Sequence, residues 1–411
     1  LLTTIDSLID DASNKLWRAR VGACGALGDV IVGRSWKELG GGGAVMDDDD
    51  MIPHNDIGGN TTAGIRLLRL LRVTTRSMDD VRLKVRESGE SLGRSVRALI
   101  ISLCDPKEES LKGDIFLGGN TAIIAQMESD TKAAAATALR WLVKHGLNQP
   151  APEATGFCIS ILLGVTDVAK HSTLQPVLPE LIYSLLMAMS GLEPQALNYL
   201  QVRASGNESV GGAPGSYDQL ERVRLQLAQS GPIASALTKC LGMVRFLDQD
   251  SQKHIIPHLD AALRCGAGFA TRAAVADAVT SLCSTSPNAF RSLGHPSTNP
   301  TVRLLRALYF ASEREKGAGA RDKMAHALGS VAELAPRKSV RLLAIRACER
   351  YRSSLGGSNN DPSTRQAAAA ALRSIAVRAS NQFSDGGKND IWCGQDHNCH
   401  KVSLMNGYTP G

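Results

Sequence analysis

The sequence predicts an all-α fold, a HEAT/armadillo-type alpha-alpha superhelix (solenoid) of roughly seven to nine helix pairs. Aromatic residues make up only 4% of the chain, which is few for a core built from sheets. Alanine runs at 133–139 and 367–376 combine high helix propensity with side chains small enough for close helix contacts. In addition, a short phrase of residues recurs along the chain at a spacing that fits stacked helical repeats.

The recurring phrase is a basic residue followed seven positions later by an aliphatic residue, with alanine just before the aliphatic residue. Five instances follow this pattern: Arg20 to Leu27, Lys132 to Leu139, Arg272 to Val279, Arg321 to Leu328 and Arg365 to Leu372. A sixth, Arg86 to Leu92, is one residue shorter and has Ser91 in place of alanine. We expect the alanine and aliphatic positions to face the core and the basic residue to lie just inside the second helix of each pair.

The spacing of the basic residues gives the repeat length. From Arg86 onward they are 46, 140, 49 and 44 residues apart, and 140 is close to three periods of about 47. HEAT and armadillo repeats have periods of roughly 40 to 47 residues. Each unit exposes an apolar face that only a neighbouring unit can bury.

The first helices of the pairs are predicted between these phrases, where apolar residues recur at spacings of three and four. The clearest are 174–189, 251–265 and 299–313. Proline near the start of such a helix is tolerated because the first-turn amides have no helical partner.

We expect one solenoid over 1–380, interrupted by flexible loops at 39–60 and 205–216, and a disordered or non-homologous tail over 381–411. Both loops are rich in glycine, and the first also contains the acidic run Asp47–Asp50. Segments of this composition cannot bury a core.

The nine cysteines are odd in number and scattered, which indicates buried thiols in a reducing compartment. The chain shows no leader and no apolar run long enough to span a bilayer. We therefore predict a cytoplasmic and nuclear protein. The start at Leu1, without methionine, suggests a fragment of a longer polypeptide.

The basic residues of the phrase form a predicted ladder along one edge of the solenoid, and this ladder is the candidate binding site. It consists of Arg20, Lys132, Arg272, Arg321 and Arg365. Two interpretations are open: the ladder binds acidic peptides, or each member pairs with a carboxylate of the preceding repeat. We favour the pairing.

Charge is concentrated near the C-terminus. Residues 301–380 hold 15 Lys and Arg against 6 Asp and Glu, a net +9 in a chain of net +6. This segment is compatible with an acidic protein surface, with nucleic acid or with an ordinary solvated helix face. Few aromatic residues accompany it, so we do not expect nucleic acid as the partner.

Two common catalytic motifs are absent: the sequence has no phosphate-binding GxxxxGK[ST] and no HExxH. We predict that the protein is not an enzyme and has no cofactor, metal or small-molecule ligand. The tail residues Cys393, Asp396, His397, Cys399 and His400 lack the spacing of a zinc finger.

Two other sets of residues have a structural and a functional interpretation. His254 and His258 are four apart, as in a helical metal site, but no nearby carboxylate has the expected geometry and Pro257 lies between them, so packing or surface exposure is favoured. Trp17 and Trp141 flank repeat phrases, where core packing is favoured over gripping a ligand.

Several phrases are more specific than a HEAT consensus, and SGLEPQALNYL at 190–200 is the most specific. Together these phrases, at 16–34, 78–105, 178–203 and 233–283, resemble the C-terminal half of the large proteasome-associated HEAT-repeat adaptor and scaffold family, in the same order. The similarity runs with interruptions over 1–380. Members of that family are several times longer than this chain.

The resemblance implies a non-catalytic scaffold that binds the proteasome holoenzyme, bridges its regulatory and core particles and supports its assembly, stability and quality control. It also implies possible association with endomembranes through partners, and it transfers no individual contact residue. Other classes stay open: another HEAT scaffold of the nuclear transport receptor or phosphatase subunit type, a nucleic-acid-binding solenoid, or a metal-dependent enzyme that uses the tail.

Overall fold

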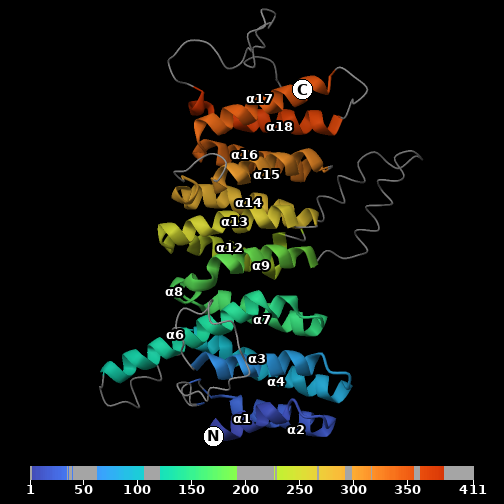
Figure 1. Ribbon diagram of the computed structural model, residues 1–411, viewed down its shortest axis with the longest axis vertical. Helices are drawn as coiled ribbons and strands as arrows, with labels where there is room; N and C mark the ends of the chain where they lie inside the picture. The colour runs from blue at the N-terminus through green and yellow to red at the C-terminus, as the bar shows by residue number, and fades with distance from the viewer. Residues whose placement is uncertain are drawn as a thin grey trace, which may run out of the picture.

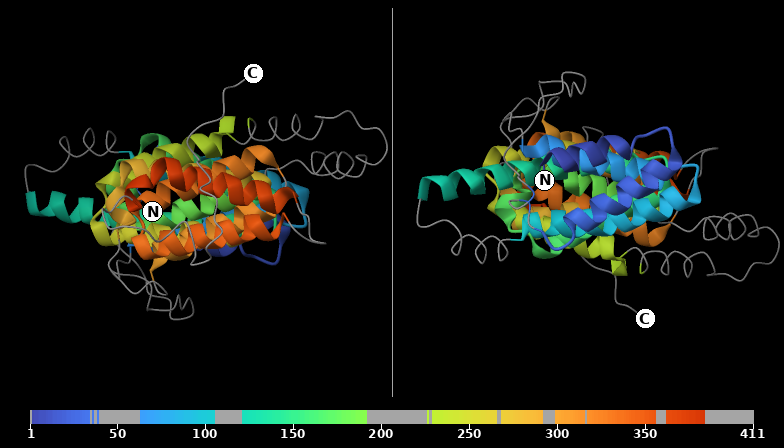
Figure 2. Two further views of the ribbon diagram at one scale, coloured as in Figure 1. Left: turned by 90° about the horizontal axis from the view of Figure 1, so that it is seen from above. Right: turned by 90° about the horizontal axis from the view of Figure 1, so that it is seen from below.

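The fold is described from a computed structural model in which helix pairs are stacked along one axis, from the N-terminus at one end to the C-terminal helices at the other (Figure 1). The structure describes residues 2–383 except 35, 37–38, 40–62, 106–120, 192–225, 227–228, 266–267, 292–298, 316 and 356–361. Seen along the stack, the helices superimpose in two parallel rows, and α6 projects beyond them (Figure 2).

The described residues form seven consecutive helix pairs. The first four are α1 (Leu2–Asp11) with α2 (Trp17–Ile31), α3 (Ala63–Met78) with α4 (Leu83–Cys104), α6 (Thr121–Lys144) with α7 (Pro152–Val168), and α9 (Leu178–Gly191) with α12 (Pro232–Met243). The last three are α13 (Gln249–Cys265) with α14 (Phe269–Thr285), α15 (Pro300–Arg314) with α16 (Ala318–Leu334), and α17 (Arg337–Ser353) with α18 (Pro362–Arg378). Second helices pack on second helices, as α14, α16 and α18 do, and this all-α HEAT-type solenoid confirms the predicted fold class.

The basic residue of the phrase has a constant place in five of these pairs. Arg20, Arg86, Arg272, Arg321 and Arg365 are each the fourth residue of the second helix. Lys132 differs: it lies in the middle of α6, the first helix of its pair, so its predicted position was wrong. The alanine run after Lys132 lets one 24-residue helix continue where the other repeats have a turn.

The three predicted first helices are present. Predicted 251–265 and 299–313 correspond to α13 and α15, and Asn299 caps α15 by accepting hydrogen bonds from the amides of Thr301 and Val302 at 2.9 and 3.4 Å. Predicted 174–189 is divided, because the short α8 (His171–Leu174) and a 3-10 turn at Gln175–Val177 precede α9.

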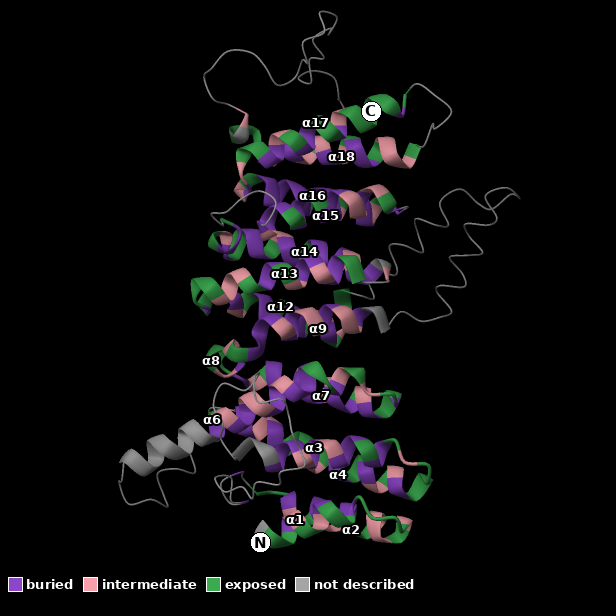
Figure 3. Ribbon diagram, in the orientation of Figure 1, coloured by how far each residue is buried: buried purple, intermediate pink, exposed green. Residues whose placement is uncertain are grey.

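One apolar core runs through the stack between the two helix rows (Figure 3). The aliphatic residues of the phrase supply much of it: Leu27, Leu92, Leu139, Val279 and Leu328 are fully buried. Ala138, Ala278, Ala327 and Ala371 are buried beside them, which lets the helices approach closely. Ala26 and Leu372 are only half-buried.

The predicted loops at 39–60 and 205–216 and the predicted tail lie outside the described residues, with few exceptions. Leu39, the first residue of the first loop, is buried in the core. A 3-10 turn at Ser380–Gln382 closes the described chain after α18, and Phe383 packs against the core.

Candidate functional site

In three helix pairs the turn is held by the arginine at the fourth position of the second helix, which is Arg20, Arg86 or Arg321. Arg20 donates to the carbonyl oxygens of Asn14 and Lys15, at 2.8 and 3.1 Å. Arg86 donates in the same way to the carbonyl of Asp80, at 2.9 Å. Because each turn carbonyl lies at the end of a helix connection with no helical partner, the guanidinium satisfies an acceptor that would otherwise need water.

The same arginine also reaches the next pair. Arg20 donates from Nε and Nη2 to the two carboxylate oxygens of Asp80, at 2.8 and 3.1 Å, so the pair is bidentate. Asp80 stands six residues before Arg86, in the turn between α3 and α4. Two arginines therefore contact the turn between α3 and α4. Arg86 of the same pair binds the backbone carbonyl of Asp80, and Arg20 of the previous pair binds the Asp80 side chain.

The same geometry recurs at the turn between α15 and α16. Arg272 of α14 donates from Nε and Nη2 to one carboxylate oxygen of Glu315, at 3.0 and 2.8 Å. Arg321 donates from Nε to the Glu315 carbonyl at 3.3 Å and reaches the side chain of Gln366 in the pair above. Glu315 is buried, so its charge depends on these donors.

The five predicted ladder residues are therefore only partly brought together. Arg20, Arg272 and Arg321 make the contacts above. Two of the side-chain partners are carboxylates and the third is the amide of Gln366, and all three belong to the following repeat, not to the preceding one as we expected. Lys132 is exposed on α6, and Arg365 is half-buried on α18. Peptide binding by these five residues stays a prediction.

Asp80 and Glu315 are the residues that the sequence analysis missed. Both stand six positions before a phrase arginine, and this spacing was the available signal. Burial raises the pKa of the Asp80 carboxyl, but the amide of Arg82 and the Arg20 guanidinium outweigh it, so the pKa lies below its usual value of 3.8. Asp80 is therefore held in its charged form.

His258, Trp17 and Trp141 take part in packing, whereas His254 is exposed. The ring of His258 lies 5.7 Å from that of Tyr183 on α9, and burial lowers the pKa of His258. Trp141 belongs to the core, while Arg18 and Lys84 flank the half-buried Trp17 ring at 5.3 and 6.0 Å. The described residues contain no group of three or more metal-ligand side chains, and the Cys/His tail lies outside them.

A second charged surface runs along the first helices α13, α15 and α17. It carries five exposed arginines, which we call the arginine edge: Arg264, Arg303, Arg306, Arg346 and Arg350. Arg264 and Arg303 share the carboxylate of Asp260, at 2.8 and 3.1 Å. Arg346 lies over the ring of Phe310, 4.8 Å from its centroid, and Arg350 pairs with Glu313 at 3.6 Å. On α15, Arg303, Arg306, Phe310 and Glu313 follow one another at spacings of three and four, so these contacts lie along one face of the helix. The net +9 of 301–380 had indicated this surface in part.

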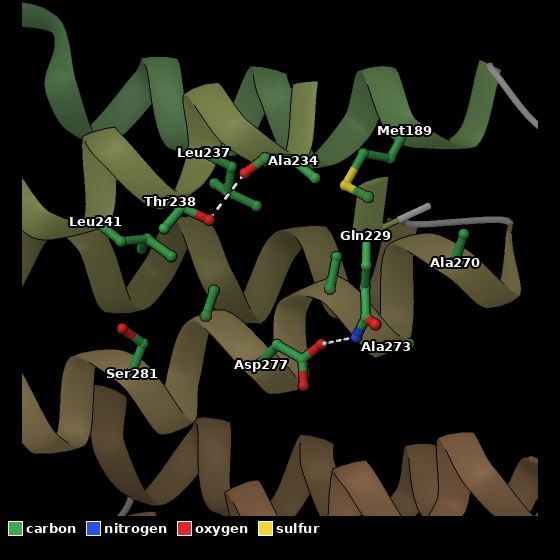
Figure 4. A pocket seen from close by; sticks show the side chains of 12 residues that line it. Met189, Gln229, Ala234, Leu237, Thr238, Leu241, Ala270, Ala273, Asp277 and Ser281 are labelled. Atoms are coloured by element: carbon green, nitrogen blue, oxygen red, sulfur yellow. Dashed lines mark hydrogen bonds between the residues drawn. The ribbon is translucent and has the colours of Figure 1, made fainter. Parts of the chain in front are cut away.

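A cavity of about 340 Å³ lies between α9, α12 and α14, near the C-terminal end of α9 (Figure 4). Leu237, Leu241 and Met189 line it together with small residues of α14. Asp277 stands at its side, accepts a hydrogen bond from Gln229 at 3.1 Å and pairs with Lys323. The Asp277 carboxylate at this cavity therefore already has partners within the protein.

Among the described helices, none combines the length and the apolar character that crossing a bilayer requires.

Stacked antiparallel helix pairs, a continuous core and arginines that link successive turns define the protein as a HEAT-repeat solenoid. A family model described as the HEAT-repeat domain of the proteasome adapter and scaffold protein ECM29 matches residues 174–352. The match confirms, as a distant similarity, the resemblance seen in the sequence. The family consists of scaffolds that are generally not catalytic.

Two relatives give the extent of the similarity. The proteasome adapter and scaffold protein ECM29 of Homo sapiens is 25% identical over 283 residues, which are 69% of this chain and 12% of the human protein. The proteasome component ECM29 of Saccharomyces cerevisiae is 26% identical over 204 residues, which are 49% of this chain and 9% of the yeast protein. The chain thus spans only a small part of the length of the curated relatives it matches.

Among solved structures, importin beta is 12% identical, over 94% of this chain and 46% of that chain, with a TM-score of 0.32.

Proposed function

We propose that this chain is a non-catalytic part of a scaffold that binds the proteasome. The observation that carries the proposal is the family match over 174–352, which covers the stack from α9 to α17. The names of both relatives connect them with the proteasome. A semi-rigid solenoid of stacked pairs suits this task, because it presents an extended surface to a large partner.

The finer parts of the proposal concern how the scaffold acts. The partners would be the proteasome regulatory and core particles, and binding would support their assembly, stability and quality control. We place this activity in the cytoplasm and the nucleus, with endomembranes reached through partners. Five of the seven described cysteines are buried, as expected of a protein from a reducing compartment.

The test is a pull-down of the epitope-tagged full-length parent from cell extract, with and without the segment equivalent to 1–380. We expect proteasome subunits with the intact parent and a loss when the segment is deleted. Unchanged recovery without the segment would place binding elsewhere in the parent. Absence of proteasome subunits in both samples would remove the proposal.

A further inference from the structure

The arginine edge directs positive charge toward solvent because its acids lie underneath the arginines. The Arg303 side chain is 56% exposed, whereas that of its partner Asp260 is 5% exposed. The Arg350 and Glu313 side chains show the same contrast, with 51% and 12% exposed. Five arginines over these two acids leave the surface of the edge net positive.

Four of the five arginines, all except Arg306, also have partners within the protein that hold them in place before any ligand arrives. Asp260 fixes Arg264 and Arg303 together, and the Phe310 ring supports Arg346. A guanidinium has five N–H donors, and an ion pair to one carboxylate oxygen uses only part of them. The remaining donors can meet the carboxylates of a ligand in a bidentate way, with less loss of side-chain entropy than free arginines would suffer.

Exposed aliphatic residues adjoin the edge on α17, where much of the helix is exposed (Figure 3). Leu342 and Ile345 are 55% and 41% exposed, and Leu342 lies one helical turn before Arg346. Glu349, the exposed acid of this helix, lies one turn after Ile345. The surface therefore offers arginines and apolar contacts side by side.

We propose that the arginine edge, together with Leu342 and Ile345, is the docking site for an acidic segment of a partner protein that also carries leucine-like residues, in the manner of an amphipathic helix. Carboxylates of the segment bind the exposed guanidiniums, and its aliphatic side chains cover Leu342 and Ile345. The inference rests on the proposed function only in that the occupant is a protein.

Nucleic acid fits this surface less well. Phosphates would use the arginines but not the aliphatic residues, and single-stranded nucleic acid is usually held by stacking on open aromatic rings. Phe310 is the aromatic residue that the described contacts place within the edge, and Arg346 covers its ring.

The test measures binding of a fluorescein-labelled 18-residue peptide to the purified full chain by fluorescence anisotropy. The peptide is designed as a helix with Leu on one face and Glu elsewhere. Two matched peptides replace either all Leu by Ser or all Glu by Gln, and a single-stranded DNA oligonucleotide of similar length is the fourth probe. Titrations at several NaCl concentrations measure the electrostatic contribution to the binding affinity.

Two double variants address the two halves of the site. Arg306→Gln with Arg346→Gln removes two charges of the edge without touching its ion pairs, and Leu342→Ser with Ile345→Ser removes the apolar part. Matched controls lie elsewhere: Lys170→Gln with Arg373→Gln removes the same charge, and Val377→Ser on α18 removes an exposed aliphatic residue. Circular dichroism melts show that each variant folds.

We expect the arginine variant to weaken binding of the Leu/Glu peptide about tenfold and the aliphatic variant to weaken it at least about threefold. The controls should stay within about twofold, both altered peptides should bind more weakly, and affinity should fall as NaCl rises. Equal binding by all variants, or equal binding of the peptide without Leu, would overturn the proposal. Tighter binding of the oligonucleotide, with the same dependence on Arg306 and Arg346, would assign the surface to nucleic acid instead.

The outcome is separate from that of the pull-down. Peptide binding with no recovered proteasome would remove the proposed function and leave the docking site. Proteasome recovery with no peptide binding would support the proposed function and contradict the docking site.

Discussion

At the scale of single residues, the arginine at the fourth position of the second helix links successive repeats. Arg20 holds the turn of its own pair through a carbonyl and reaches the carboxylate of Asp80 in the turn of the next pair, and Arg272 reaches Glu315 in the same way. Buried ion pairs are sensitive to loss of one partner, because the remaining charge is left without compensation. The substitutions that follow use this property.

Replacing Arg272 by alanine should destabilise the protein by about 3 kcal/mol, because Glu315 is buried and loses both hydrogen bonds from this side chain. Urea unfolding followed by circular dichroism measures the change. Arg373→Ala is the control, since Arg373 is exposed, and it should cost less than about 0.5 kcal/mol. Similar losses in both variants would contradict the role of the ladder.

Replacing Asp80 by asparagine should have an effect that depends on pH. The folded-state pKa of Asp80 lies below its usual value of 3.8, so the stabilisation by its charge is complete above that value and is lost as pH falls through the folded-state pKa. We expect a cost of about 1–2 kcal/mol that is constant from pH 7 to pH 5 and shrinks below about pH 4. Urea unfolding of both proteins across this range measures it, and a cost that does not change on acidification would contradict the explanation.

At the scale of helices, the close approach of neighbouring second helices depends on small residues. Gly329 of α16 faces α18 at Ser374, and a Cβ at Gly329 would stand 2.8 Å from the Ser374 carbonyl oxygen. No real Cβ contact is that short, so the helices would have to separate. Gly25 of α2 is the opposite case, because nothing lies within 4 Å of the position of its Cβ.

We therefore expect Gly329→Ala to destabilise the protein by about 1–3 kcal/mol through this clash. Gly25→Ala should instead stabilise it by about 0.5–1 kcal/mol, because alanine has the higher helix propensity and no contact is disturbed. Thermal unfolding of both variants and of the wild-type protein measures these changes in stability. A stabilised Gly329→Ala variant would show that α16 and α18 are not in close contact.

At the scale of the whole molecule, a solenoid joins repeats that touch only their neighbours, so its core can be probed separately along its length. Cysteines supply natural probes. Burial raises the pKa of Cys158 on α7 and of Cys240 on α12 to about 12, whereas Cys265 at the end of α13 is exposed.

Thiol labelling at pH 8 should modify Cys265 quickly and leave Cys158 and Cys240 unmodified until the chain unfolds. With a pKa of about 12, only about one in ten thousand of these thiols is ionised at pH 8, and burial also blocks access. Mass spectrometry of the labelled peptides identifies each site, and Cys265→Ser serves as the control. Rapid labelling of Cys158 in native buffer would show that the core around α7 opens freely.

Much of the architecture follows from local patterns. The alanine-rich phrase, its period of about 47 residues and the apolar spacing of 251–265 and 299–313 predict stacked pairs, and α13, α15 and the second helices bear this out. The family also follows from the sequence, because phrases longer than a HEAT consensus carry it. The helix that contains Lys132 did not follow, since an alanine run continues a helix equally well in either row.

The tertiary structure alone decided which residues meet. Periodicity places Arg20 on a helix, but the stacking of pairs determines that its partner is Asp80, 60 residues later and in the following repeat. Likewise, net charge indicated a basic C-terminal region, while only packing shows that Asp260 and Glu313 lie beneath Arg303 and Arg350. The physical reason is that helix formation depends on residues within one or two turns, whereas ion pairs between repeats depend on how whole helices stack.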